Sequence, residues 1–265
     1  MNIERIATTK KNFNRASNTY DQEAYVHRQV AKYLYTHLNR PRLVNNILDI
    51  GSGTSILSEF ITKNFSDEII YNTDLSDEML RVAQNKFKKS HFIHANMLEL
   101  PFGEDFDIVL SSMSLQWLED PEKIVEIVSK HLKTGASFAI SVVMRGTFDR
   151  ITRLRKLIVS ESGTNLADNS SQAERLPTFE HLKSSFNSSK LTLNRSEKHL
   201  FKHHYKNVED CFSAIKNLGI AGNSQRKLSQ EEFKKLIQSY KNEISDFNLA
   251  PELDYQVGFF WGIKS

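Results

Sequence analysis

The fold is decided by residues 47–55, which have the sequence ILDIGSGTS. Residues 46–50 form a short, mostly apolar run of strand length, and Gly51 and Gly53 follow it. Glycine permits a tight turn and lets a ligand approach the backbone closely. A helix is expected to begin at Leu57, and the first N–H groups of such a helix point into the same crevice. This order predicts a ligand site at the carboxyl end of a buried strand.

The spacing of the glycines restricts the kind of ligand. A dinucleotide fingerprint requires a third glycine at position 56, where this chain has Ile56, so a nicotinamide cofactor is disfavoured. Asp74 ends the next expected strand, and a carboxylate in that place accepts hydrogen bonds from two ribose hydroxyls. The unit therefore predicts a ribose-containing cofactor of another kind.

Strand-like and helix-like segments alternate over residues 46–143, which predicts an α/β fold with a parallel sheet and helices on both faces. The expected strands there are 46–50, 68–74, 91–95, 106–111 and 138–144, and the expected helices are 57–64, 77–88 and 121–132, the last ended by Gly135. Beyond Met144 the alternation stops. There we expect helices at 147–160, 177–186, 208–218 and 229–241, strands at 191–195 and 253–264, and a polar loop at 161–172.

The composition of the 265 residues fits an ordinary globular protein of one large domain or two small ones. The single Cys211 excludes an internal disulfide framework, and the net charge of +3 does not indicate a nucleic-acid binder. No apolar run approaches the ~20 residues of a membrane helix. Residues 5–20 lack acids, which fits a mitochondrial presequence or a first helix with a basic face. We favour the helix and expect a cytoplasmic protein.

Residues 49–53, Asp74 and the strand at 106–110 together resemble the class I S-adenosylmethionine-dependent methyltransferases. The resemblance spans residues 46–143. It implies a Rossmann-like, doubly wound, mostly parallel seven-stranded sheet, whose reversed last strand is supplied by 253–264. It implies one domain, made of an N-terminal helical cap (1–45), a cofactor core (46–144), a helical lid after the fifth strand (145–190) and a C-terminal part (191–265).

The same resemblance implies S-adenosylmethionine as the cofactor and S-adenosylhomocysteine as its product. Gly51 and Gly53 would line the methionine part, Asp74 would hold the ribose, and Ser111 would lie near the transferred methyl group. The expected cofactor-binding residues are Asp49, Gly51, Ser52, Gly53, Asp74, Leu75, Met79, Asn96, Met97 and Ser111, with Arg28 for the cofactor carboxylate. The chain departs from the pattern at Ser55, where a third glycine is usual, and at Asn96, where Asp is common. A degenerate domain that does not bind the cofactor is the alternative.

Further stretches narrow the resemblance. They are NFNRA at 12–16, the Tyr20-Asp21 pair, YVHRQ at 25–29, SSMSLQW at 111–117, and shorter matches at 146–148, 175–177 and 215–229. Over residues 12–264 the chain is similar to the malonyl-acyl-carrier-protein O-methyltransferases of biotin synthesis, the BioC type. The near alternative is a branch that modifies an arginine of a respiratory-complex subunit and often has His in place of Gln116. A third hypothesis is a non-catalytic scaffold.

The BioC resemblance implies that a malonyl carboxylate oxygen attacks the sulfonium methyl, forming a methyl ester. A carboxylate is already ionised at neutral pH, so no general base is needed and we assign no proton-transfer residue. The site needs donors that orient the carboxylate, and Arg suits this role through bidentate geometry. The candidates are Arg145, Arg175, Tyr20, Tyr25 and Gln116.

The balanced charge conceals a pattern, since residues 41–145 carry a net charge of −5 and the two flanking parts carry +4 each. Arg150, Arg153, Arg155 and Lys156 place four cations on one expected helix. The acidic acyl carrier protein is the expected partner of this helix, steered by complementary charge. We expect a monomer. We also expect no metal site, because His91 and His94 lie on one expected strand and point to opposite faces.

Overall fold

One seven-stranded sheet, in the order β3-β2-β1-β4-β5-β7-β6, organises the computed structural model, which describes residues 3–118, 120–161, 172–220 and 227–265. The strands are β1 (Ile47–Ile50), β2 (Ile70–Asp74), β3 (His91–His94), β4 (Phe106–Ser112), β5 (Leu132–Val143), β6 (Leu191–His204) and β7 (Glu252–Lys264). Strands β1 to β5 pair in parallel, and β7 runs antiparallel to both β5 and β6. The expected Rossmann-like sheet with a reversed last strand is confirmed.

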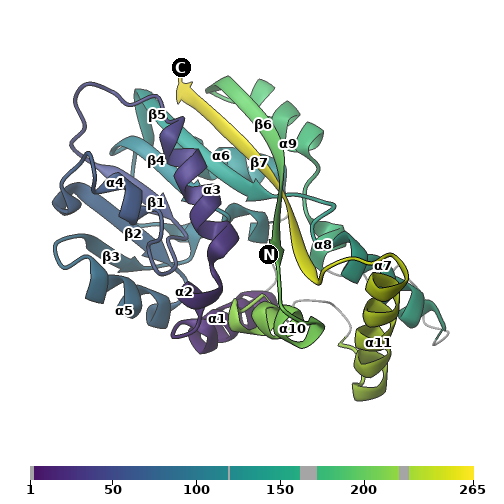
Figure 1. Ribbon diagram of the computed structural model, residues 1–265. Helices are drawn as coiled ribbons and strands as arrows, with labels where there is room; N and C mark the ends of the chain where they lie inside the picture. Colours follow the sequence, from purple (N-terminus) through teal and green to yellow (C-terminus); the bar gives the residue numbers. More distant parts are fainter. Residues whose placement is uncertain (1–2, 119, 162–171, 221–226) are drawn as a thin grey trace.

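Helices cover both faces of this sheet (Figure 1). The helices are α1 (Ile3–Ala16), α2 (Tyr20–Glu23), α3 (Tyr25–Thr36), α4 (Ser58–Ile61), α5 (Asp77–Lys86), α6 (Pro121–His131), α7 (Asp149–Glu161), α8 (Gln172–Arg175), α9 (Phe179–Asn187), α10 (Val208–Asn217) and α11 (Gln230–Asp246). One core cluster joins α3, α4 and α10 to the sheet, and a second joins α6 and α9 to it. Neighbouring residues of one strand serve opposite clusters, as Ile47 and Leu48 do.

Capping side chains define where several of the helices begin. Ser76 accepts a hydrogen bond from the Met79 N–H and begins α5, and Asp120 begins α6 with Pro121 in its first turn. A capping box between Ser229 and Glu232 begins α11. Such caps satisfy backbone N–H groups that have no partner inside the helix.

Two expectations about the elements need correction. Gly135 does not end the helix before β5, because α6 stops at His131 and residues 132–143 already pair as a strand. Strand β6 continues to His204 instead of ending at Arg195. Among the described strands it pairs only with β7, so it is an edge strand, and its many charged side chains obscure the strand pattern in the sequence. The polar loop expected at 161–172 falls almost wholly outside the described residues.

Two of the helices after β5 pack in different places, with α9 on the sheet and α7 away from it. Helix α7 packs along α11 through a small cluster that includes Leu154, Ile158, Leu236 and Tyr240. Figure 1 shows these two helices projecting from the end of the sheet, while α1 and α2 lie beneath the carboxyl ends of β1 and β2. In the part of the chain that the structure describes, no helix is long and apolar enough to cross a membrane.

Candidate functional site

The glycine loop after β1 contains three residues with left-handed backbones. Gly51, Gly53 and Ser55 have φ of 67°, 56° and 59°. Ser55 stands where a third glycine was expected, and it is fully buried with its hydroxyl donating to Asn72 Oδ1 at 3.1 Å. A left-handed backbone is costly for a residue with a Cβ, so this hydrogen bond offsets part of the strain. The loop therefore has the geometry of the three-glycine pattern despite the substitution.

Gly51 is the position in this loop that tolerates no side chain. A Cβ built there would overlap Ser114 Oγ, on the segment that follows β4. A Cβ built on Gly53 would meet no atom within 4 Å. The two glycines thus share a left-handed backbone but differ in the space around them, which separates backbone strain from steric exclusion.

Two carboxylates lie beside the loop and differ in their partners. Asp74 Oδ2 accepts from the Gly53 N–H and its Oδ1 from the Ser76 N–H, each at 2.8 Å. Asp49 is 1% exposed, and neither of its oxygens has a hydrogen-bond partner among the described residues. Burial, together with the negative charge of Asp74, raises the pKa of Asp49 to about 8. Burial also raises the pKa of Asp74.

These residues line a cavity that we call the loop pocket. Nine of the expected cofactor-binding residues line it: Asp49, Gly51, Ser52, Gly53, Asp74, Leu75, Met79, Asn96 and Met97. The other residues that line it are Thr9, Phe13, Tyr20, His27, Ala31, Ile56, Leu57, Thr73, Ala95, Ser112, Met113, Ser114 and Trp117. Residues of the N-terminal helices therefore meet residues that follow β1, β2 and β4 at the carboxyl ends of these strands.

Two expected cofactor-binding residues lie outside the loop pocket. Ser111 is fully buried and its hydroxyl donates to the Ile50 carbonyl at 2.8 Å, so its neighbour Ser112 faces the pocket instead. This follows from the alternation of side chains along β4. Arg28 pairs with Glu59 at 3.4 Å and donates to the Asp21 carbonyl at 3.3 Å. In this structure, Arg28 holds the protein's own acidic residues.

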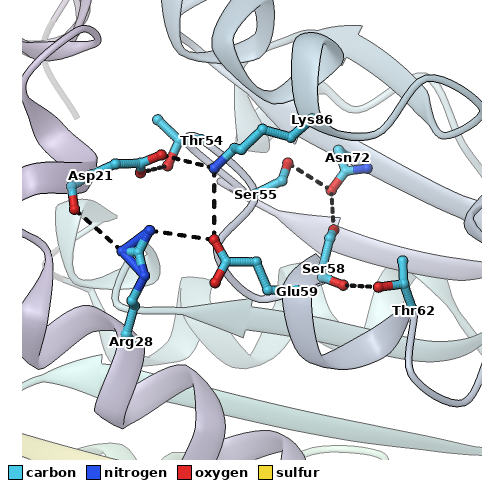
Figure 2. A network of polar contacts seen from close by, with 9 residues as sticks. All are labelled: Asp21, Arg28, Thr54, Ser55, Ser58, Glu59, Thr62, Asn72 and Lys86. Carbon is cyan, nitrogen blue, oxygen red and sulfur yellow. Dashed lines mark hydrogen bonds and ion pairs between the residues drawn. The ribbon is translucent and has the colours of Figure 1, made fainter.

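Arg28 belongs to a polar network that ties the N-terminal helices to the glycine loop (Figure 2). Asp21 is its centre. Its Oδ1 accepts from the Thr54 hydroxyl at 2.6 Å, and its Oδ2 accepts from Lys86 Nζ at 2.9 Å. Thr54 directly follows Gly53 in the glycine loop. The network therefore holds the N-terminal helices, which cover the loop pocket, against this loop.

A second cavity, which we call the apolar pocket, adjoins the loop pocket. Five residues line both cavities: Phe13, Tyr20, His27, Met113 and Trp117. Gln116, Val143, Thr147, Phe148, Ala173, Leu176, Ile220 and Tyr255 complete its wall. None of the described residues that line it is an Asp, Glu, Lys or Arg. The apolar pocket is therefore an uncharged cavity, as far as its described residues go, that shares part of its wall with the loop pocket.

Tyr20 and His27 stand at the junction of the two pockets. Their rings are 5.3 Å apart, and the ring of Tyr255 lies 5.9 Å from that of His27. Burial, with the nearby charge of Arg28, lowers the pKa of His27 to about 4. Burial and the charge of Asp74 raise the pKa of Tyr20. At neutral pH, His27 is uncharged and a weak base, while the Tyr20 hydroxyl keeps its proton.

The residues expected to orient the substrate carboxylate are only partly brought together. Tyr20 and Gln116 line the apolar pocket, whereas Tyr25 is 53% exposed and stacks on His203 at 4.4 Å. Arg145 is exposed in a separate surface hollow, and Arg175 lines neither pocket. Arg145 lies outside the apolar pocket although β5 ends two residues earlier at Val143, which lines it.

The basic helix is less positive than its sequence suggested. Arg150 and Arg153 share Glu243 of α11, at 3.2 and 2.5 Å, and Lys156 lies 3.8 Å from Glu174. Arg155 is only 8% exposed. The expected dense patch of four cations is therefore wrong. Arg153 and Lys156 remain about half exposed on α7.

Several lining residues escaped the sequence reasoning, notably Thr9 and Phe13 of α1 and His27 of α3. Helix periodicity marks α1 as amphipathic but does not tell which partner its apolar face meets. Phe13 contacts Trp117 edge to face at 5.5 Å, which joins α1 to the segment after β4. Across the described ranges, no group of His, Cys, Asp and Glu side chains is arranged to hold a metal ion.

Comparison with known sequences relates this chain to methyltransferases. Residues 48–140 match the family model described as a methyltransferase domain. Over 251 residues the chain is 26% identical to the malonyl-[acyl-carrier protein] O-methyltransferase of Priestia megaterium. That alignment covers 90% of this chain and 91% of the relative.

Solved structures resemble the chain at lower identity. The YcgJ protein of Bacillus subtilis superposes with a TM-score of 0.61 at 16% identity, over 89% of this chain and 98% of its own. Geranyl diphosphate C-methyltransferase of Streptomyces coelicolor, solved with Mg²⁺, geranyl diphosphate and S-adenosyl-L-homocysteine, superposes with a TM-score of 0.52 at 13% identity. That superposition covers 89% of this chain and 77% of the other. Both likenesses establish a shared fold.

Proposed function

Because the chain has the class I methyltransferase fold with S-adenosylmethionine as its cofactor, we propose that it methylates the free carboxylate of malonyl-acyl carrier protein. The name of the Priestia relative, which aligns over 90% of this chain, supports this substrate. The product would be a methyl ester, which removes a charge that fatty-acid elongation does not accept. In the proposed role, the reaction begins the synthesis of the pimeloyl chain of biotin.

The loop pocket fits the cofactor on the chemistry of its own residues. Asp49 offers two buried oxygens that have no partner among the described residues, and such atoms favour a bound donor or cation. The open space beside the Gly53 backbone allows a close approach, and Asp74, which also lines the pocket, would accept hydrogen bonds from the ribose hydroxyls. Asn96 lines the pocket beside Met97, and its Oδ1 also accepts from the Leu98 N–H at 3.2 Å.

One observation carries the choice of acceptor, namely that the described residues that line the apolar pocket include no Asp, Glu or Lys that could act as a general base. His27 is the titratable imidazole in its lining, and a pKa of about 4 makes it a poor proton acceptor. When bound, S-adenosylmethionine supplies an electrophilic methyl group on a positively charged sulfonium. A carboxylate oxygen takes that methyl without losing a proton, so the pocket suits a carboxylate better than an alcohol or an amine.

Neutral donors replace the arginine that was expected in the pocket. The Tyr20 hydroxyl keeps its proton, and a neutral imidazole such as His27 has one N–H to donate. Both residues line the junction of the pockets, where the acceptor would meet the cofactor. The hydrogen bonds that Tyr20 and His27 would donate to the acceptor are stronger where water is excluded from the junction.

The arginine-modifying alternative requires different chemistry at the same place. A guanidinium stays protonated in proteins, so it needs a base before it can accept a methyl group. No Asp or Glu lines the apolar pocket among the described residues. This difference favours the carboxylate acceptor over the guanidinium.

The acyl carrier protein is the proposed macromolecular partner, with the exposed face of α7 as its docking surface. Arg153 and Lys156 are the half-exposed cations of that face, and Arg145 lines the same surface hollow. Reversing Arg145 and Lys156 to Glu should slow methylation at low salt and have little effect at high salt. An unchanged rate at both ionic strengths would remove α7 from the docking surface.

Rescue of a biotin-requiring bacterial strain that lacks its own malonyl-carrier methyltransferase tests the function. The wild-type chain should restore growth without biotin, and Gly51→Ala should fail because it loses the cofactor. Gly103→Ala, expressed at the same level, is the matched control and should retain the rescue, because a Cβ there makes only ordinary contact with Asp105. Failure of the well-expressed wild-type chain would contradict the proposal.

A further inference from the structure

Gln116 is a buried polar side chain in a cavity whose walls are otherwise mostly apolar. It lies on the short helix η3 (Leu115–Leu118), directly after β4, and is 6% exposed. It lines the apolar pocket but not the loop pocket. Gln116 is thus placed beyond the junction, on the side of the acceptor.

The orientation of its amide is decided by a single contact. Gln116 Nε2 donates to the Met113 carbonyl oxygen at 2.6 Å. A carbonyl oxygen only accepts, and two oxygens at that distance would repel each other, so the amide nitrogen must face Met113. The amide oxygen, Oε1, is buried and has no hydrogen-bond partner within the described ranges.

Met113 holds this amide in place from an unusual backbone conformation. Its φ is 51°, which is uncommon for a residue other than glycine. Its N–H donates to the Ser141 carbonyl at 2.9 Å, and Ser141 Oγ also lies 3.1 Å from it. Strain of this kind persists where the surrounding structure determines it, and it gathers at functional sites.

An unpaired buried acceptor identifies the chemistry of its partner. Oε1 requires an N–H or O–H donor and repels a carboxylate, which has only acceptor oxygens at neutral pH. The amide nitrogen keeps a second N–H besides the one that faces Met113, so donation from Gln116 to the substrate carboxylate stays a prediction, and Oε1 requires a donor of its own. Leaving such an acceptor unmatched is costly, so it discriminates strongly between ligands.

We propose that Gln116 Oε1 accepts a hydrogen bond from the secondary amide N–H of the pantetheine arm that carries the acyl group. This subsite is distinct from the place where the carboxylate reacts, and it rests on the proposed function for the identity of the arm. The amide nearest the thioester is the first N–H donor along that arm. The apolar walls formed by Val143, Phe148, Leu176 and Ile220 suit the methylene groups that lie between.

A pair of small substrates tests the proposal. One is the malonyl thioester of N-acetylcysteamine, which contains this amide, and the other is its ester analogue, in which oxygen replaces the N–H. Wild-type protein should prefer the amide by about tenfold in kcat/KM, mainly through KM. Gln116→Leu should lose this preference and methylate both at similar rates. Gln238→Leu, on the outer face of α11, is the matched control and should keep the preference.

Binding measurements separate this proposal from the proposed function. The affinity of each variant for S-adenosylhomocysteine, measured by calorimetry, should equal that of wild type and so shows that the loop pocket is folded. A wild type without preference for the amide, or a Gln116→Leu variant that keeps it, would overturn the subsite.

Methylation of neither thioester by wild type would contradict the proposed function. The subsite is then judged by the binding of the amide and ester forms of the methylated product, in the presence of S-adenosylhomocysteine. Tighter binding of the amide form, lost in Gln116→Leu, supports the subsite, and equal binding of both forms overturns it.

Discussion

The loop pocket and the apolar pocket share a wall but differ in the ionisable residues that line them. The loop pocket contains the carboxylates Asp49 and Asp74, whose pKa values burial raises. The apolar pocket has no Asp, Glu, Lys or Arg among the described residues that line it, and its junction residue His27 is uncharged at neutral pH. A positively charged cofactor suits the first pocket, and an acceptor that needs no base suits the second. The difference teaches that the two pockets, although they share a wall, suit two different parts of the proposed reaction.

Substitution of Gly51 should have the largest effect, and it should be confined to the loop pocket. Gly51→Ala places a Cβ onto Ser114 Oγ in a left-handed backbone. We expect affinity for S-adenosylhomocysteine to fall about 100-fold or more, measured by calorimetry. Gly53→Ala carries the backbone strain alone, of about 1–2 kcal/mol, and should lose roughly tenfold. Equal losses in the two variants would show that the contact with Ser114 is unimportant.

Asp49 should make the loop pocket less stable as pH rises. The pKa of Asp49 is raised to about 8 in the folded chain and is near 4 in the unfolded chain. Its stabilising contribution is therefore fully present below pH 4 and is lost progressively as the pH rises to 8. Asp49→Asn should therefore flatten the fall in unfolding free energy between pH 5 and 8, an effect on the order of a few kcal/mol. Urea denaturation of the cofactor-free protein at several pH values measures it. A parallel pH profile for both proteins would contradict this account.

His27 should show the opposite dependence. Its pKa is lowered to about 4, so the unfolded chain binds a proton more readily than the folded chain between pH 6.5 and 4. The unfolding free energy should fall over that window by up to about 3 kcal/mol. His27→Gln should remove this part of the fall, as measured by thermal and urea unfolding. His37→Gln, on an imidazole nearer the end of α3, is the control and should leave the fall unchanged.

The polar network around Asp21 should have the smallest effect, because its ion pairs are partly exposed (Figure 2). Asp21→Asn weakens the contact with Lys86 and should cost about 1 kcal/mol of cofactor affinity, or a few-fold in Kd. Cleavage within the N-terminal helices by a dilute protease should become faster. Asp210→Asn, on α10, is the control. An unaltered Kd and cleavage rate would show that the network does not hold the cap.

The sequence predicted the loop pocket far better than the apolar pocket, for a physical reason. The strand and glycine pattern specifies local backbone geometry, so a ligand site at the glycine loop and a ribose carboxylate at Asp74 could be predicted from spacing, and the family resemblance implied the other cofactor residues. The apolar pocket is assembled from α1, α3, the end of β5, α8 and β7, which meet only through tertiary packing. Periodicity along one helix does not reveal which distant helix it contacts.

Individual residues show where that limit lies. Arg28 and Arg145 were assigned to the site because Arg suits a carboxylate, yet the fold directs Arg28 to Glu59 and leaves Arg145 exposed. Gln116 was expected as a donor to the substrate; the structure puts it in the lining of the apolar pocket, and the direction of its hydrogen bond depends on Met113, which only the structure shows. Side-chain direction depends on partners that are distant in sequence, so residue type alone does not determine it.

The central claim is tested most directly by incubating the protein with malonyl-acyl carrier protein and S-adenosylmethionine labelled in the methyl group. The account predicts label on the carrier-bound acyl group as a methyl ester, released as methanol by mild base. Succinate and a carrier without the acyl group, added in place of the substrate, should acquire no label. Absence of label on malonyl-acyl carrier protein, with cofactor binding intact, or label that resists mild base, would contradict carboxyl methylation.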